Sequence, residues 1–156
     1  MRRLLTAVSA LAIGVLASGV ARADQCKPIH AMITTSVTGC LPGESPIGFC
    51  TAGNIDSGLL AGSTHFGVQS MTPTPSGDIL YTGVLTVTTR SGTVTIKDYG
   101  ILTDGLYSEM QQVVSGTGHF KHITGMLVSQ GSLLGGTFTG RLVGTLCHFN
   151  RGHDDG

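Results

Sequence analysis

Hydrophobic and polar residues alternate with a period of two through most of the chain, and no stretch after residue 23 holds the 3.6-residue period of a helix. The alternation is clearest in residues 79–90, where one face carries large apolar side chains and the other carries mostly threonine. The apolar face of that segment consists of Ile79, Tyr81, Leu85 and Val87. Alternation of this kind predicts β-strands with one buried face.

The same pattern predicts further strands, separated by turns rich in glycine and proline. Together with residues 79–90, the predicted strands are 29–37, 58–70, 93–102, 107–114, 125–134 and 136–149. Tight turns are predicted at Ser91-Gly92, Asp104-Gly105 and Gly135-Gly136. Residues 40–54 are loop-like, and residues 72–77 form a turn because their two prolines cannot donate to a strand ladder.

Glycines punctuate the segment between strands 107–114 and 125–134. Gly116, Gly118 and Gly125 predict a bent corner there, because glycine tolerates the backbone angles that sharp bends need. In the last predicted strand, glycine alternates with large apolar residues on one face, which suits the tapering interior of a small barrel. That face holds Gly136, Phe138, Gly140, Leu142, Gly144 and Leu146.

The predicted fold is therefore all-β: a closed antiparallel barrel of about eight strands. Closure leaves no exposed sheet edge, which suits an exported protein. A β-sandwich is the alternative, but the chain has no tryptophan and no immunoglobulin pattern.

The glycine corner also carries a resemblance to a known family. Residues 114–125, with residues 107–109 before them and residues 136–140 after them, resemble the G-T-G-x-F…G signature of the allene oxide cyclase and dirigent proteins. The resemblance implies an eight-stranded barrel with a central apolar cavity, assembled as a homodimer or homotrimer. It also implies, from the plant members, an isomerase or cyclase that guides reactions of hydrophobic small molecules without a cofactor.

The start of the chain has the features of a secretory signal peptide. Arg2 and Arg3 are followed by an uncharged apolar run, residues 4–20, and by the small-x-small cleavage site Ala21-Arg22-Ala23. A membrane anchor is the alternative, but small residues dilute the apolar run. We expect a signal peptide at 1–23, a single barrel domain at 24–149 without a membrane span, a disordered tail at 150–156, and a secreted or periplasmic location.

All four cysteines follow the predicted cleavage site, and an even number in an oxidising compartment predicts two disulfides. Of the three pairings, we prefer Cys40–Cys50 with Cys26–Cys147, because the first closes a proline- and glycine-containing loop. A zinc site is the alternative, but no C-x-x-C pair exists. Without the leader and its arginines the chain is weakly acidic and has no basic run, which argues against nucleic-acid binding.

Three polar residues are candidates for the lining of a cavity. Alternation places Asp98 on the apolar face of its strand, where burial would raise its pKa and could make it a general acid or a polar contact for a ligand. The interpretation that we favour for this residue alone is a structural aspartate that is hydrogen-bonded to the backbone near the end of the strand. Tyr81 shares the interior face of the neighbouring strand, and pairing around Ser91-Gly92 would place Asp98 near Leu85. Glu109 shares one face of its strand with Tyr107, Gln111 and Val113. This face points either to the interior or to solvent. If it points to solvent, Met110 and Val114 point inward.

No catalytic signature stands out. His119 and His122 have an H-x-x-H spacing, but at a corner, where a rigid metal site is not expected, and no cofactor-binding motif is present. We expect an exported barrel that binds a small hydrophobic ligand through Tyr81, Asp98 and Glu109 without a reaction. An isomerase or cyclase that uses the same residues, and a structural surface protein with a solid barrel, remain as alternatives.

Overall fold

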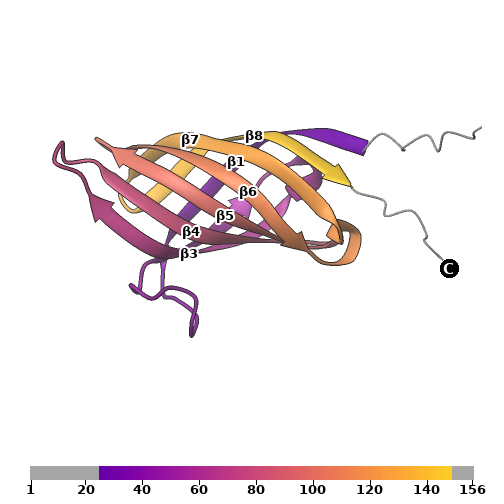
Figure 1. Ribbon diagram of the computed structural model, residues 1–156, viewed down its shortest axis with the longest axis horizontal. Coiled ribbons are helices and arrows are strands. Elements are labelled where there is room, and N and C mark those ends of the chain that lie inside the picture. The colour runs from indigo at the N-terminus through magenta and orange to yellow at the C-terminus, as the bar shows by residue number, and fades with distance from the viewer. Residues whose placement is uncertain (1–24, 149–156) are drawn as a thin grey trace, which may run out of the picture.

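The computed structural model describes residues 25–148, so the predicted signal peptide at 1–23 and the predicted tail at 150–156 lie outside the described residues. Eight antiparallel strands follow one another around a closed barrel (Figure 1). The strands are β1 (Gln25–Thr38), β2 (Cys50–Ile55), β3 (Gly62–Pro73), β4 (Ile79–Thr89), β5 (Gly92–Thr103), β6 (Leu106–Gly116), β7 (Ile123–Leu134) and β8 (Thr137–His148). Two 3-10 turns, η1 (Gly58–Leu60) and η2 (Gly118–Phe120), are the helical elements of this part of the chain, and no helix within it is long and apolar enough to span a membrane.

The barrel closes where the first strand pairs with the last. β1 and β8 run antiparallel in register from Gln25 opposite His148 to Ser36 opposite Thr137. Each of the other neighbouring pairs is consecutive in the chain, so every strand has a partner on both sides. The predicted closed antiparallel barrel is confirmed, and the sandwich alternative is excluded.

One half of the barrel is filled with apolar side chains. The alternation that predicted β4 and β5 is confirmed, because Val87, Val94 and Ile96 are fully buried on the inner face. The same half of the core contains Ile29, Leu60, Phe120, Ile123, Leu127 and Leu146. Burial of such side chains is the main source of stability in a fold of this kind.

The glycine corner closes this filled end. β6 ends at Gly116, η2 turns across the opening, and Phe120 inserts a fully buried ring. The corner is held to the β4–β5 hairpin by backbone hydrogen bonds, in which Thr117 N–H donates to Thr93 O and His119 N–H donates to Ser91 O, both at 2.9 Å. The predicted corner is therefore confirmed.

Three details of the strand prediction are wrong. Residues 50–55 form β2 instead of a loop, because their backbone pairs with β1 on one side and with β3 on the other. Leu60 belongs to η1 and is buried at the filled end of the barrel. Pro73 ends β3 opposite Ile79, a position at which a missing N–H is tolerated.

The register of the β4–β5 hairpin also differs from the prediction. Thr89 pairs with Gly92, so the two turn residues are Arg90 and Ser91. Gly92 belongs to the strand, where Thr117 O lies so close that a side chain would not fit. The shift places Asp98 opposite Gly83 instead of Leu85, two positions nearer to Tyr81 along β4.

Both predicted disulfides are present. Cys26 and Cys147 are cross-strand partners in β1 and β8, so their bond lies across the seam that closes the barrel. Cys40–Cys50 closes the base of the loop between β1 and β2, which projects from the wall of the barrel (Figure 1).

We predict that the two disulfides contribute unequally to stability. In the chain-entropy model, the Cys26–Cys147 bond, with a sequence separation of 121, contributes about 5 kcal/mol, against about 3 kcal/mol for Cys40–Cys50, with a separation of 10. The double variants Cys26→Ala/Cys147→Ala and Cys40→Ala/Cys50→Ala should therefore differ in free energy of unfolding in denaturant. Thiol titration would verify that each variant keeps its other bond, and equal losses would contradict the prediction.

Candidate functional site

The half of the barrel opposite Phe120 contains a cavity of about 270 Å³. This volume is close to the lower limit of small-molecule sites, ~300 Å³. Most of its wall is apolar, and the apolar lining includes Phe66, Leu85, Leu102, Leu133 and Phe138. The polar side chains that line it are Thr35, Thr51, Tyr81, Asp98, Tyr107, Glu109, Gln111 and Ser129.

A glycine brings Tyr81 and Glu109 together across an intervening strand. On β5, Gly100 lies between them, opposite Tyr81 on one side and opposite Glu109 on the other. The Tyr81 ring lies over Gly100 in the space that a Cβ would occupy. The phenol therefore reaches β6, where its hydroxyl donates to Glu109 Oε1 at 2.7 Å.

Gln111 connects the two carboxyl groups. It is the cross-strand partner of Asp98, and both side chains are almost fully buried. Gln111 Nε2 donates to Asp98 Oδ2 at 2.8 Å and to Glu109 Oε2 at 3.2 Å. Because one amide donates to both carboxyls, Asp98 and Glu109 form a single polar cluster with Tyr81.

A second tyrosine extends this cluster toward β8. The Tyr107 ring occupies the space beside Gly140, and its hydroxyl accepts a hydrogen bond from Ser129 Oγ at 3.3 Å. An edge-to-face contact with Phe138, at 5.7 Å between ring centroids, fixes the ring against the apolar wall.

Burial shifts the pKa of both carboxyls toward neutrality. The pKa of Asp98 is raised to about 8, mainly by burial and then by the charge of Glu109, while the hydrogen bond from Gln111 opposes the shift. The pKa of Glu109 is raised to about 7 by burial, and the hydrogen bonds from Tyr81 and Gln111 oppose that shift. The same burial and the neighbouring carboxyl raise the pKa of Tyr81, so its hydroxyl stays a donor. Groups this close titrate as a pair.

The structure brings together the three residues that the sequence singled out. Tyr81, Asp98 and Glu109 all line the cavity, and the inward orientation of Glu109 settles the open question about β6, because Met110 and Val114 are exposed instead. Gln111, Tyr107 and Ser129 also line the cavity and were not predicted as site residues. The signal for the first two was their spacing of two from Glu109, which places all three on one face.

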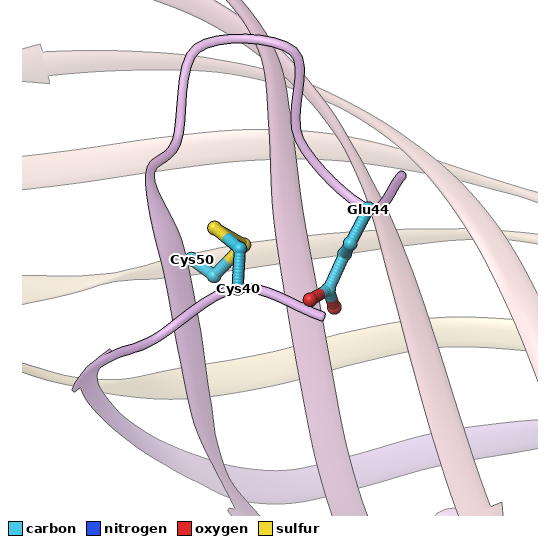
Figure 2. A group of neighbouring side chains, drawn as sticks. All are labelled: Cys40, Glu44 and Cys50. Atoms are coloured by element: carbon cyan, nitrogen blue, oxygen red, sulfur yellow. A yellow bond between two sulfur atoms is a disulfide. The ribbon is translucent and has the colours of Figure 1, made fainter. Parts of the chain in front are cut away.

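Residues that could hold a metal lie elsewhere. Within residues 25–148, one group of three ligand-type side chains is close enough, namely Cys40, Glu44 and Cys50 (Figure 2). Both sulfurs belong to a disulfide, so neither is the thiolate that metal binding needs. Glu44 instead pairs with His65 and accepts from Leu41 N–H at 2.8 Å, which anchors the loop to β3. His119 and His122 are exposed at the corner.

Comparison with known protein families and with curated proteins finds no significant match to this chain. The geometry of the cavity therefore carries the functional argument.

We predict that the carboxyl pair makes the barrel less stable as the pH rises. The folded pKa values of about 8 and about 7 lie above the ordinary values of 3.8 and 4.5, so the folded state binds more protons than the unfolded state between about pH 4 and about pH 8. The contribution of these groups to the free energy of unfolding is complete below about pH 4. It is lost as the pH rises to about 8, by at most about 1.4 kcal/mol per pH unit for each group.

Denaturant unfolding at several pH values measures this slope. Asp98→Asn with Glu109→Gln should flatten it, whereas Asp104→Asn, in the exposed β5–β6 turn, should leave it unchanged. A wild-type slope that the double variant retains would show that other groups cause it.

Proposed function

We propose that this protein binds a small, largely apolar molecule inside its barrel. The observation that carries the proposal is the cavity of about 270 Å³, whose apolar wall converges on a few fixed polar groups. This combination is typical of sites that bury the body of a ligand and orient it through few hydrogen bonds. A solid structural barrel would instead have its whole interior filled by side chains, as the half around Phe120 is.

A second function, acid–base isomerisation or cyclisation, is favoured by the state of the two carboxyls. With pKa values of about 8 and about 7, one group of the pair can hold a proton near neutral pH while the other accepts one. The resemblance to the allene oxide cyclase and dirigent proteins would agree with this second function. The closed eight-stranded barrel supports that resemblance at the level of the fold and says nothing about the reaction.

Export and assembly also stay proposals. The two disulfides are of the kind found in oxidising compartments, which supports a secreted or periplasmic location. Association into homodimers or homotrimers rests on the family resemblance.

We predict that a bulky side chain in the cavity wall abolishes binding. Ile79 lines the cavity, whereas its neighbour Leu80 points outward on the same strand, so Ile79→Trp and Leu80→Trp form a matched pair. In a thermal-shift titration with phenethyl alcohol and phenethylamine, wild type and Leu80→Trp should give a stabilisation that rises with the logarithm of ligand concentration and reaches about 3 kcal/mol at a hundredfold excess over Kd, and Ile79→Trp should give none. Undiminished binding by Ile79→Trp would place the ligand elsewhere.

We predict for the second function that the barrel accelerates proton exchange next to a carbonyl group. In D₂O, phenylacetone should gain deuterium at its α-carbon faster with the wild-type protein than with Glu109→Gln, because the carboxylate acts as the base. Mass spectrometry measures the incorporation, and the outward variant Leu80→Trp serves as the control. A wild-type rate no greater than that of buffer would leave binding as the function.

A further inference from the structure

We propose that the ligand is an apolar amine, whose hydrocarbon body fills the cavity and whose protonated nitrogen donates hydrogen bonds to Asp98 and Gln111. This proposal rests on the proposed binding function, because it names the chemical class that the same cavity takes.

Donors and acceptors are out of balance among Tyr81, Asp98, Glu109 and Gln111. The two donating side chains of this group are already engaged: Tyr81 donates to Glu109, and the amide of Gln111 donates to both carboxyls. Two buried acceptors, Asp98 Oδ1 and Gln111 Oε1, have no hydrogen-bond partner among the protein atoms of residues 25–148. The cluster therefore has surplus acceptors, which a bound donor would satisfy.

Both unpartnered acceptors are deeply buried. Asp98 is 2% exposed and Gln111 is 1% exposed, and both side chains line the cavity. An unsatisfied buried polar group destabilises the folded state, and the cost is greater when the group is charged. A ligand nitrogen with several N–H groups recovers this cost at both acceptors, whereas a hydroxyl has one proton to donate.

The wall of the cavity carries acidic groups. Two carboxyls line it, and among residues 25–148 no lysine, arginine or histidine does. Lys97, the neighbour of Asp98 on β5, is exposed on the outer face. Among charged ligands this cavity therefore favours a cation. The attraction between a cation and the two carboxyls is strong there, because it takes place away from water.

A cationic ligand should also change the protonation of the pair. The titratable groups that face Asp98 are Glu109, Tyr81 and Tyr107, from β4 and β6, and none of them carries a positive charge. A bound ammonium group stabilises the ionised carboxyls and lowers their pKa, so binding near neutral pH releases protons. Affinity for the amine should rise from about pH 6 to about pH 9, because the two carboxyls ionise over this range. The amine itself does not titrate there, because an alkyl amine, like lysine, stays protonated up to about pH 10.

The experiment compares phenethylamine, phenethyl alcohol and phenylacetate, which share an aromatic body and differ in the polar group. In calorimetric titrations near pH 8, we expect phenethylamine to bind about tenfold or more tightly than phenethyl alcohol, and phenylacetate to bind least. Repeating the titration in buffers of different ionisation enthalpy should reveal the release of up to about one proton per amine and none per alcohol.

Two variants test the role of the carboxyls. Asp98→Asn and Glu109→Gln should each reduce the preference for the amine over the alcohol and reduce proton release, while binding of the alcohol persists. Neither variant should unfold the barrel, because each replaces a buried carboxyl that is costly to ionise with a neutral group of similar shape. Asp104→Asn, on the surface, should keep the full preference.

Each outcome separates this inference from the proposed function. Equal affinity for the amine and the alcohol, or tighter binding of phenylacetate, would overturn the amine assignment and leave the binding function intact. An amine preference that survives in both carboxyl variants would also overturn it. Binding of none of the three probes would overturn the binding function and the amine assignment with it.

Discussion

The pairing of β1 with β8 is the constraint on which the rest of this structure depends. Without it, the sheet would have two free edges, and the inner face of each strand would have no opposite wall to pack against. Eight closed strands enclose an interior that is just wide enough for side chains or for one small ligand. The seam is reinforced by the Cys26–Cys147 disulfide, which joins two directly opposed residues.

The side chains that cover glycines differ between the two halves of the interior. Where the cavity lies, aromatic rings cover glycines of neighbouring strands: Phe66 lies over Gly83, Tyr81 over Gly100, and Tyr107 beside Gly140. Rings in these positions line the wall and leave the axis of the barrel unfilled. In the other half, branched aliphatic side chains and the Phe120 ring project toward the axis and fill it. The cavity is thus a consequence of pairing aromatic residues with glycine.

The sequence predicted the faces of the strands better than their ends or register. Two-residue alternation in β4 and β5 is enough to point Tyr81 and Asp98 inward, because a strand with one buried face has no other arrangement. It could not reveal β2, whose residues Gly53 and Asn54 have low strand propensity and are held by their neighbours on both sides. Register depends on which residues form a turn, and Gly92 resembled a turn residue although the approach of Thr117 is what requires it.

The polar cluster was harder to predict for a related reason. Pattern alone left Glu109 on either face, since β6 carries Met110 and Val114 on its outer side and polar residues on its inner side, the reverse of the usual rule. The contact between Tyr81 and Glu109 crosses a whole strand at Gly100, and no spacing within a single strand encodes it.

The arrangement of Asp98 bears on whether the cluster is structural or functional. A structural aspartate near the end of a strand would accept backbone N–H groups, yet the described hydrogen bond to Asp98 comes from the side chain of Gln111, and its other oxygen has no partner among residues 25–148. Burial raises the pKa of both carboxyls, so the pair stabilises the fold less than apolar side chains of similar volume would. Because the pair lies where the filled half ends and the cavity begins, its energetic cost supports our proposal that a ligand enters the cavity and interacts with the two carboxyls.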